Sequence, residues 1–502
     1  MKFQGAKTIT TKESICYSLI AFTAIIISIG LWFFPLISDD LFSVIYFKDT
    51  FLHGDAFDLN VYYTNIKQIF ETNHFRLPNL LMPVIILLPK WIPALISCIS
   101  IFYILRTGSQ LGNFNCSWKG MTIFASGFIF LFPWWDQLYL VSFQAPYLWG
   151  SALSLILLKS ILTHKWHSVV LLFIGSVLLG FWLEAYAGVI LGACICLMIF
   201  FKSHRNRYIV AVSIGLSCGI LIDALPLILQ CKWTRWAFFE ERMILIYPFL
   251  FVNLLYVVLS ALMARKHVSA VLTPINLTLL EISIASTVLT IYFKTGARIN
   301  GLGAICSLIG IIYLIRQIKF GRNGVVGFIS VTAGLLAACH MIDVDILSYR
   351  LNEETKYVLE RYQLYSERPV FAPLTFREDA SLLALQKPYF DWFAHEKTLG
   401  VFNKIYGKGN LQLEVVPAQL RDFSLHEAEK IAGEANIFYY KGYLVTTNPD
   451  SHWHNVDFGG GLKPHYFHTV VFKEEGNTQY AWMHLDYASI EVVISPRPHR
   501  ID

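Results

Sequence analysis

Charge is scarce in this chain of 502 residues: 15% of the residues are charged, against about 25% in a typical soluble domain. Because 55% of the residues are hydrophobic, polar surface cannot cover the chain, which excludes a wholly water-soluble fold. Residues 344–502 contain no cysteine, so that part folds without disulfides. No CxxC pair occurs, and we interpret the nine cysteines as small apolar fillers rather than metal or redox ligands.

The sequence also lacks an internal repeat, a low-complexity tract and a phosphate-binding loop of the GxxxxGK type. Its charge is unevenly distributed. Residues 2–343 carry 24 Lys+Arg against 14 Asp+Glu, whereas residues 344–502 carry 16 against 21. The basic excess therefore belongs to loops between apolar runs, and we expect no nucleic-acid partner.

Apolar runs near the length of a membrane span, about 17 to 25 residues, recur through the first two thirds of the chain. We expect about eleven transmembrane helices, near residues 15–37, 91–106, 119–134, 146–162, 167–183, 186–201, 208–230, 243–263, 269–293, 301–316 and 324–342. The first run is longer than the apolar part of a signal peptide, and no cleavage site follows it, so we interpret it as a retained helix.

The loop charges predict the orientation. With the N-terminus in the cytoplasm, fifteen Lys+Arg face the inside and about nine the outside, in agreement with the positive-inside rule. An odd number of spans then places the C-terminal domain outside the cytoplasmic membrane, in the periplasm of a Gram-negative cell. The longest outer loop, 38–90, should contain a helix over 62–75 and an interfacial helix over 76–89.

Two domains follow: a transmembrane domain over 1–343 and a soluble α+β domain over 344–502. The second should begin with a helix over 354–365. The segment 423–435 should form a short helix with a capping box between Ser424 and Glu427. Alternating patterns predict two hairpins, over 436–448 and 465–487, the second turning at residues 475–477.

Two adjacent carboxylates, Asp39 and Asp40, follow the first apolar run directly. A carboxylate at the outer face can take a proton from a hydroxyl, or can hold a divalent cation near a phosphate. The alternative is a polar cap, in which residue 38 opens the next helix and both acids lie at its positive end.

Further candidates lie in the outer loops. His74 and Arg76 close the first loop, and an arginine fork at the interface suits a phosphate, unless it only anchors the next helix. The aromatic stretch 133–150 contains Asp136 and could stack on sugar rings or form an interfacial belt. Arg235 and Arg298, with other loop cations, could surround an anionic lipid or simply attract head groups.

Acids also occur within apolar runs. Glu184 lies between two such runs, where a carboxylate needs a partner or a water-filled cavity. Asp223 and Glu281 are weaker candidates and could form structural pairs. In the C-terminal domain four histidines lie within residues 452–468, but we favour surface histidines over a zinc site, so no metal ligands are assigned.

These motifs together resemble the GT-C glycosyltransferases, which use polyprenyl-phosphate sugars as donors. The closest likeness is to bacterial GT-C-like proteins with Asp-Asp after the first helix, Arg before the second, a Tyr-Leu-Trp-Gly segment and a later Glu. These features correspond to Asp39-Asp40, Arg76, Tyr147–Gly150 and Glu184. The chain is also similar to glucosyltransferases that decorate O-antigen. It departs from the pattern at Phe75, where Gly is expected, and it lacks a WWDYG motif.

The resemblance implies a GT-C-like membrane glycosyltransferase of the bacterial inner membrane. Its donor would be a polyprenyl-phosphate sugar and its acceptor a surface polysaccharide such as O-antigen. Asp39 or Asp40 would act as the base, and Arg76, Arg235 and Arg298 would bind the donor phosphate. Substrate contacts would come from His74, Asp136, Tyr147, Trp149 and Glu184. No cofactor is implied, and a divalent cation stays open.

Two alternatives belong to other classes. A transporter or flippase for a lipid-linked glycan predicts charges deep in several helices and inverted repeats. A non-catalytic subunit of a surface-glycan assembly complex would tolerate loss of Asp39 and Asp40.

Overall fold

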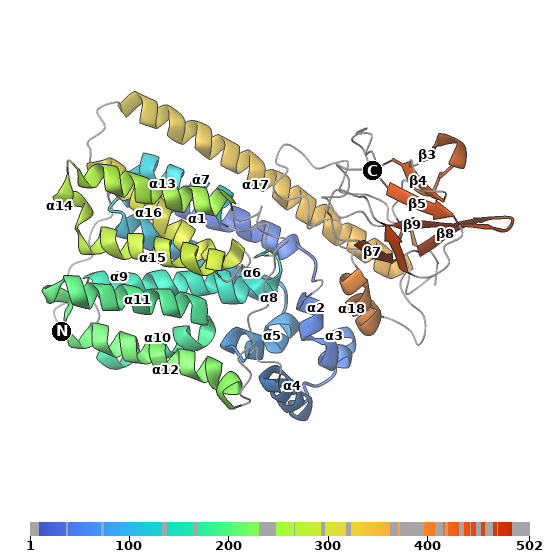
Figure 1. The fold of residues 1–502 in the computed structure, drawn as a ribbon, viewed down its shortest axis with the longest axis horizontal. Coiled ribbons are helices and arrows are strands. Elements are labelled where there is room, and N and C mark those ends of the chain that lie inside the picture. Colours follow the sequence, from blue (N-terminus) through green and yellow to red (C-terminus); the bar gives the residue numbers. More distant parts are fainter. Residues whose placement is uncertain are drawn as a thin grey trace, which may run out of the picture. The chain divides into compact units, whose positions relative to one another are not determined.

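The computed structural model is mostly helical (Figure 1). It describes residues 10–36, 39–71, 75–132, 138–163, 168–229, 247–265, 267–292, 297–317, 323–361, 370–371, 396–406, 415–416, 420–430, 436–441, 443–447, 453–456, 465–468 and 470–483. Contacts divide the chain into two compact units. The first contains Met1–Phe34 and Tyr46–Ile346, and the second contains Pro35–Ile45 and Leu347–Asp502. The division lies three residues beyond the expected one, and the short segment Pro35–Ile45 joins the C-terminal part.

Six helical segments are long and apolar enough to cross a membrane: Thr11–Phe33, Trp91–Leu111, Val141–Thr163, Arg207–Pro226, Pro274–Ile291 and Gly324–Glu360. Shorter apolar helices of 10–17 residues lie at Leu77–Leu87, Trp118–Leu131, Val169–Trp182, Glu184–Phe200, Leu250–Ala264 and Gly301–Gln317. The chain is therefore a helical membrane protein, as its composition predicts. Each of the eleven expected runs overlaps one of these helices; Leu77–Leu87 is the segment expected at the interface.

The helices that build the first unit are α1 (Thr11–Phe33), α3 (Lys48–His53), α4 (Leu59–Glu71), α5 (Leu77–Leu87), α6 (Trp91–Leu111), α7 (Trp118–Leu131), α8 (Val141–Phe143), α9 (Gly150–Thr163), α10 (Val169–Trp182), α11 (Glu184–Phe200), α12 (Arg207–Leu229), α13 (Tyr247–Ala264), α14 (Val268–Val271), α15 (Pro274–Tyr292) and α16 (Gly301–Gln317). A π-helical turn, Gln144–Trp149, leads into α9, and short 3-10 turns lie at Ile45–Phe47, Lys202–His204 and Ala297–Asn300. The helix α17 (Asn323–Glu360) runs on through the boundary between the units and includes the helix expected from residue 354.

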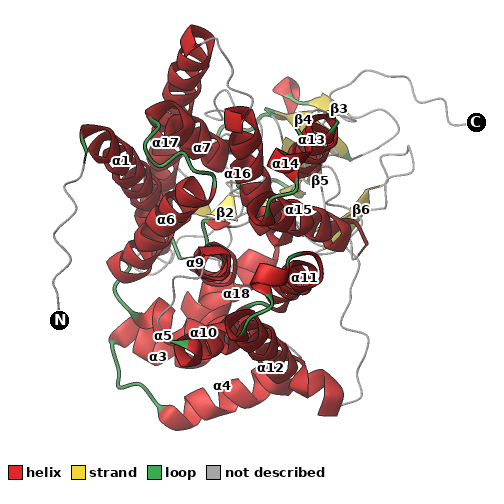
Figure 2. Cartoon of the chain, turned by 90° about the vertical axis from the view of Figure 1, so that its left-hand side faces the viewer, coloured by secondary structure: helices red, strands yellow, loops and turns green. Residues whose placement is uncertain are grey.

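Most long helices of the first unit run side by side (Figure 1), whereas α4 runs across their direction (Figure 2). The first of them, α1, begins at a capping box. The backbone N–H of Glu13 donates to Thr10 Oγ1 at 3.3 Å, and the N–H of Thr10 donates to Glu13 Oε2 at 3.0 Å. The box satisfies two N–H groups that the helix leaves without a partner.

Small residues let α10 and α12 approach closely. Gly180 lies against the backbone of Leu216 and Gly219, while Gly215 lies against Phe173 and Ser176. This order of contacts makes the two helices parallel, with small residues four apart on each, the arrangement that brings membrane helices into backbone contact.

A polar network joins α13, α15 and α16 inside the first unit. Asn253 donates to Thr287 Oγ1 at 2.7 Å and to Asn300 Oδ1 at 3.0 Å, and it accepts from Ser307 Oγ at 2.7 Å. Ser307 Oγ also lies 2.9 Å from Ser283 Oγ. Hydrogen bonds of this kind stabilise contacts between membrane helices because lipid offers no substitute partners.

The second unit contains α2 (Asp39–Ser43), α18 (Glu396–Tyr406) and a five-stranded antiparallel sheet. The strands are ordered β3 (Glu429–Lys430), β4 (Ile437–Tyr440), β5 (Tyr443–Thr447), β9 (Thr478–Met483) and β8 (Val470–Glu475). Two further pairs are β1 (Val370–Phe371) with β2 (Val415–Val416) and β6 (Trp453–Val456) with β7 (His465–His468). The sheet packs around Phe423, whose ring lies 5.1 Å from Tyr440, 5.6 Å from Phe472 and 5.3 Å from Tyr480 between ring centroids.

Both expected hairpins form, with one change. β4 and β5 turn at Lys441, and β8 and β9 turn at Gly476, whose φ of 62° suits glycine. The segment His465–His468 pairs instead with β6, so the second hairpin begins later than expected.

The prediction of a helix over residues 423–435 is wrong. Leu425–Glu427 is a single 3-10 turn, Ser424 makes no side-chain cap, and Glu429–Lys430 is an edge strand paired with β4. Glu427 Oε2 accepts from the Tyr440 hydroxyl at 3.4 Å. Pairing with the sheet therefore outweighs a local helix signal only a few residues long.

The close contact of α10 and α12 predicts the effect of one added methyl group. A Cβ at Gly219 would fall 2.7 Å from the Gly180 Cα, so Gly219→Ala should destabilise the protein by roughly 1–3 kcal/mol. The matched control is Gly188→Ala on α11, where a Cβ meets nothing within 4 Å. Thermal unfolding in detergent should show a lower midpoint for Gly219→Ala only. Equal midpoints for both variants would contradict the close packing.

Candidate functional site

The paired carboxylates lie in the first turn of α2, within the second unit. Asp40 is 1% exposed and Asp39 is half-buried, with the Ser43 hydroxyl donating to the Asp39 carbonyl at 2.9 Å. The positive end of a helix stabilises acids, which offsets part of the cost of burying Asp40. α2 packs against α18. Both carboxylates therefore lie in the first turn of a helix, where the cap alternative places them, while residue 38, the expected cap, lies outside the described residues.

Two residues of the predicted constellation meet in the first unit. Arg76 Nη2 donates to Glu184 Oε1, forming an ion pair between side chains 108 positions apart in the sequence. The two side chains are 21% and 20% exposed. Both were singled out from sequence as separate candidates, and the structure brings them together.

The local backbone explains how the pair forms. Arg76 is the N-cap of α5 in an extended conformation, and Phe75 beside it packs between Phe70 and Phe181. Leu183 is extended as well, so α10 stops at Trp182 and α11 begins at Glu184. The carboxylate therefore stands at the positive end of α11, which favours its charged form. Phe75 thus packs as an aromatic anchor directly before Arg76.

Two further groups act on the guanidinium of Arg76. Tyr147 and Asp223 both contribute electrostatically to it, and Asp223, on α12, is 2% exposed. Burial alone would lower the pKa of Arg76, but Glu184, Tyr147 and Asp223 together outweigh this effect and hold that pKa above its ordinary value. Arg76 is therefore a permanent cation that is paired with Glu184 of α11 and stabilised electrostatically by Asp223 of α12.

The guanidinium keeps donor capacity beyond this pair. Among the residues that the structure describes, no acceptor lies within hydrogen-bond distance of the buried Arg76 Nε. An arginine carries five N–H donors. The guanidinium of Arg76, which uses Nη2 to bind Glu184, can therefore still bind a second anion through its other N–H groups.

The aromatic segment before α9 is held by a buried chain of hydrogen bonds. The Trp149 indole donates to Ser97 Oγ at 2.8 Å, Ser97 donates to Gln144 Oε1 at 2.6 Å, and Gln144 donates to the Tyr139 carbonyl at 2.9 Å. Trp182 also donates to the Ala145 carbonyl at 2.8 Å. Trp149 is 6% exposed, so in this structure it packs as a core residue.

Tyr147 lies in the same π-helical turn and is also 6% exposed. Its ring meets Tyr186 edge-on, at 6.4 Å between centroids. Its electrostatic effect on Arg76 links this turn to the ion pair.

Sequence reasoning missed Ser97 and Gln144. Nothing in the sequence separates Ser97 from Ser100, another buried serine of α6, whose hydroxyl bonds the Ile96 carbonyl of its own helix. Gln144 carries a weak signal, since an amide inside an aromatic run of a membrane helix needs partners.

Other predicted site residues lie outside what the structure describes. His74, Asp136 and Arg235 belong to segments outside the described residues, and for Arg298 only the backbone, in the 3-10 turn Ala297–Asn300, is described. In the described part of the chain, no group of three or more His, Cys, Asp or Glu side chains is placed to hold a metal ion.

No protein-family model, curated protein or solved structure matches the chain. The fold and site therefore define its class as a helical membrane protein with an added α+β unit.

The buried hydrogen-bond chain predicts a contrast between two serines on one helix. Ser97→Ala leaves the Trp149 N–H and Gln144 Oε1 without their shared partner, and should cost about 1–3 kcal/mol. Ser100→Ala removes only a bond to its own helix and should be close to neutral. Thermal unfolding of both variants in detergent checks the contrast; a Ser97→Ala midpoint equal to that of Ser100→Ala would rule out the network as a structural element.

Proposed function

We propose that the protein is a GT-C-type membrane glycosyltransferase that moves a sugar from a polyprenyl-phosphate donor to an extracytoplasmic acceptor, such as O-antigen or another surface polysaccharide. The observation that carries the proposal is the Arg76–Glu184 ion pair. It joins two of the motif residues on which the family resemblance was based, at the junction of α10 and α11. Apolar helices around the pair suit a donor whose carrier is a lipid.

The reaction is a displacement at the anomeric carbon. The acceptor hydroxyl oxygen forms a bond to that carbon while the bond from the carbon to the phosphate oxygen breaks. Asp39 or Asp40 takes the hydroxyl proton, and the bonding electrons leave with the polyprenyl phosphate. Attack opposite the leaving group inverts the anomeric centre.

The leaving phosphate gains charge as the bond breaks, so a fixed cation beside it lowers the barrier. Arg76 fills this role in the proposal, with Arg235 and Arg298 as further cations. Glu184 is a positioning residue that holds the guanidinium, leaving other N–H groups for the phosphate. His74 and Asp136 are proposed to contact the sugar or acceptor, whereas Tyr147 and Trp149, both 6% exposed, would support the site from the core.

The proposed topology has eleven spans in the bacterial inner membrane, with the N-terminus in the cytoplasm and the second unit in the periplasm. The six long helices and the shorter apolar helices support it by length and composition. The distribution of Lys and Arg among the loops supports the direction.

A lipid-linked glycan transporter is the second candidate, because carboxylates, among them Glu281 and Asp345, lie within apolar helices. Glu281 Oε1 on α15 lies 2.7 Å from where a Cβ at Gly192 would stand, and Asp345 on α17 lies against Gly30 of α1. Intramembrane acids of this kind are typical of transport pathways. A non-catalytic assembly subunit is the third candidate.

The test is the composition and linkage of surface polysaccharide in cells with matched membrane levels of each variant. Asp40→Asn or Asp39→Asn should reduce sugar transfer about 100-fold or more if that residue is the base. Arg76→Lys should also reduce transfer, because lysine lacks the fork. The control is Asp55→Asn, an exposed acid in the same outer loop, which should transfer normally.

The outcomes separate the candidates. Loss of a sugar branch in an Asp39 or Asp40 variant with an intact acceptor chain supports the transferase. If both Asn variants match wild type while Glu281→Gln blocks export of the whole glycan, the transporter takes its place. If none of these variants alters the polysaccharide, the protein serves assembly rather than chemistry.

A further inference from the structure

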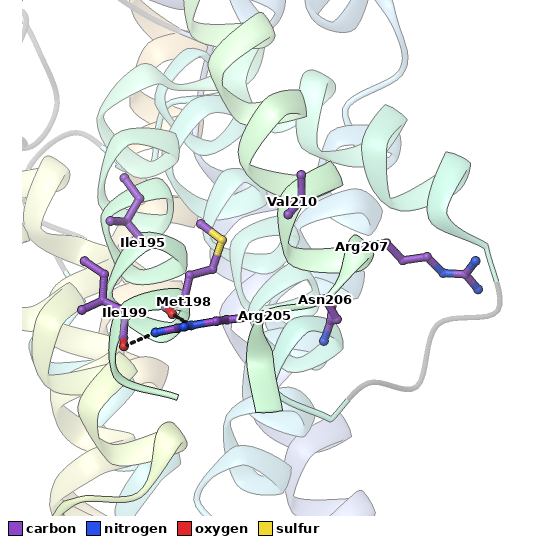
Figure 3. A pocket seen from close by; sticks show the side chains of 7 residues that line it. All are labelled: Ile195, Met198, Ile199, Arg205, Asn206, Arg207 and Val210. Carbon is purple, nitrogen blue, oxygen red and sulfur yellow. Dashed lines mark hydrogen bonds between the residues drawn. The ribbon is translucent and has the colours of Figure 1, made fainter. Parts of the chain in front are cut away.

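A pocket of about 630 Å³ lies where α11 ends and α12 begins (Figure 3). Its walls come from Ile195, Met198 and Ile199 on one side and Val210 on the other, and Arg205 and Arg207 stand at its polar edge. Glu184 begins α11, so the pocket lies at the opposite end of that helix from the proposed site. In the proposed topology this is the cytoplasmic end.

Arg205 is fixed in place by the end of α11. Its Nε donates to the Met198 carbonyl at 2.5 Å, and its Nη2 donates to the Ile199 carbonyl at 3.0 Å (Figure 3). These carbonyls belong to the last turn of α11 and have no partner further along the helix. The bonds hold the guanidinium charge at the pocket, although Arg205 itself is exposed.

Arg207 has a different position. It points away from the helix end in Figure 3, is exposed, and its guanidinium lies 5.3 Å from the centroid of the Tyr208 ring. From residue 185 to residue 222 the sequence contains no Asp or Glu, whereas Lys202, Arg205 and Arg207 lie within six positions. The positive charge at this edge of the pocket therefore has no acid nearby in the sequence to neutralise it.

The side chains that form the pocket walls are apolar, and three of them are exposed at the protein surface. Ile195, Ile199 and Val210 are 45%, 58% and 45% exposed. Exposed branched side chains next to a charged rim match a molecule with a hydrocarbon part and an anionic head. A water-soluble anion would contact only the charged rim, whereas a lipid would contact the rim and the apolar walls.

We propose that this pocket binds an anionic diacyl phospholipid. The head-group phosphate lies at Arg205, which the end of α11 holds at the pocket, and an acyl chain lies along Ile195, Ile199 and Val210. Basic sites between membrane helices suit anionic head groups, because low dielectric surroundings strengthen each charge contact. This inference depends on the membrane character of the chain and not on the proposed chemistry at Arg76.

The experiment is native mass spectrometry of the purified full-length protein released from detergent, titrated with phosphatidylglycerol or phosphatidylcholine that carry identical acyl chains. Phosphatidylglycerol should be retained at least fivefold better, and Arg205→Gln should lower its retention about fivefold. Because Arg205 also bonds the end of α11, the readout is the preference of folded protein for phosphatidylglycerol over phosphatidylcholine. Arg207→Gln removes an exposed cation whose side chain points away from the pocket in Figure 3, and it should retain the lipid as wild type does. The control is Lys12→Gln, an exposed cation at the start of α1, which should retain the lipid as wild type does.

Two results would overturn the proposal. Equal retention of the two lipids, or equal loss in Arg205→Gln, Arg207→Gln and Lys12→Gln, would mean that the pocket does not select an anionic head group. Displacement of phosphatidylglycerol by glycerol 3-phosphate at the same concentration would mean that the site binds a soluble phosphate and not a lipid.

Discussion

The ion pair of Arg76 and Glu184 is the constraint around which the first unit is arranged. A guanidinium among apolar helices needs an acid, because an unpaired buried charge costs several kcal/mol. Glu184 meets this need only because α10 stops at Trp182 and α11 begins at Glu184, with Leu183 alone between them. The glycine contacts between α10 and α12 hold that junction, and α12 also supplies Asp223. Helix packing thus fixes where the cation stands.

The two ends of α11 serve different chemistry. At its start, the helix stabilises a carboxylate that holds a cation; at its end, free carbonyls hold the cation Arg205. Both arrangements follow from the helix dipole, which favours acids at the first turn and bases at the last. One helix therefore carries a proposed reaction site at one membrane face and a proposed lipid site at the other.

Sequence patterns predicted the elements whose signals are long or local. The apolar runs gave the helices, and alternation around Lys441 and Gly476 gave two hairpins. The helix prediction for residues 423–435 was wrong because its capping signal is short. Glu429 instead pairs with Tyr439 of another strand, and a local sequence pattern contains no information on that pairing. At the site, the sequence identified Arg76 and Glu184 separately, because each is a charged residue next to apolar runs, where an unpaired charge is unfavourable. Their pairing, and the role of Ser97, depend on helix contacts that the sequence does not encode locally.

Arg76 and Glu184 act as one unit, and exchanging their charges shows whether they do. Arg76→Glu and Glu184→Arg should each lower the thermal unfolding midpoint, because each places two like charges side by side. The double variant restores an opposite pair and should recover much of the lost stability, while sugar transfer stays low because the cation has moved. If the double variant is destabilised by the sum of the two single effects, Arg76 and Glu184 do not interact and do not form a unit.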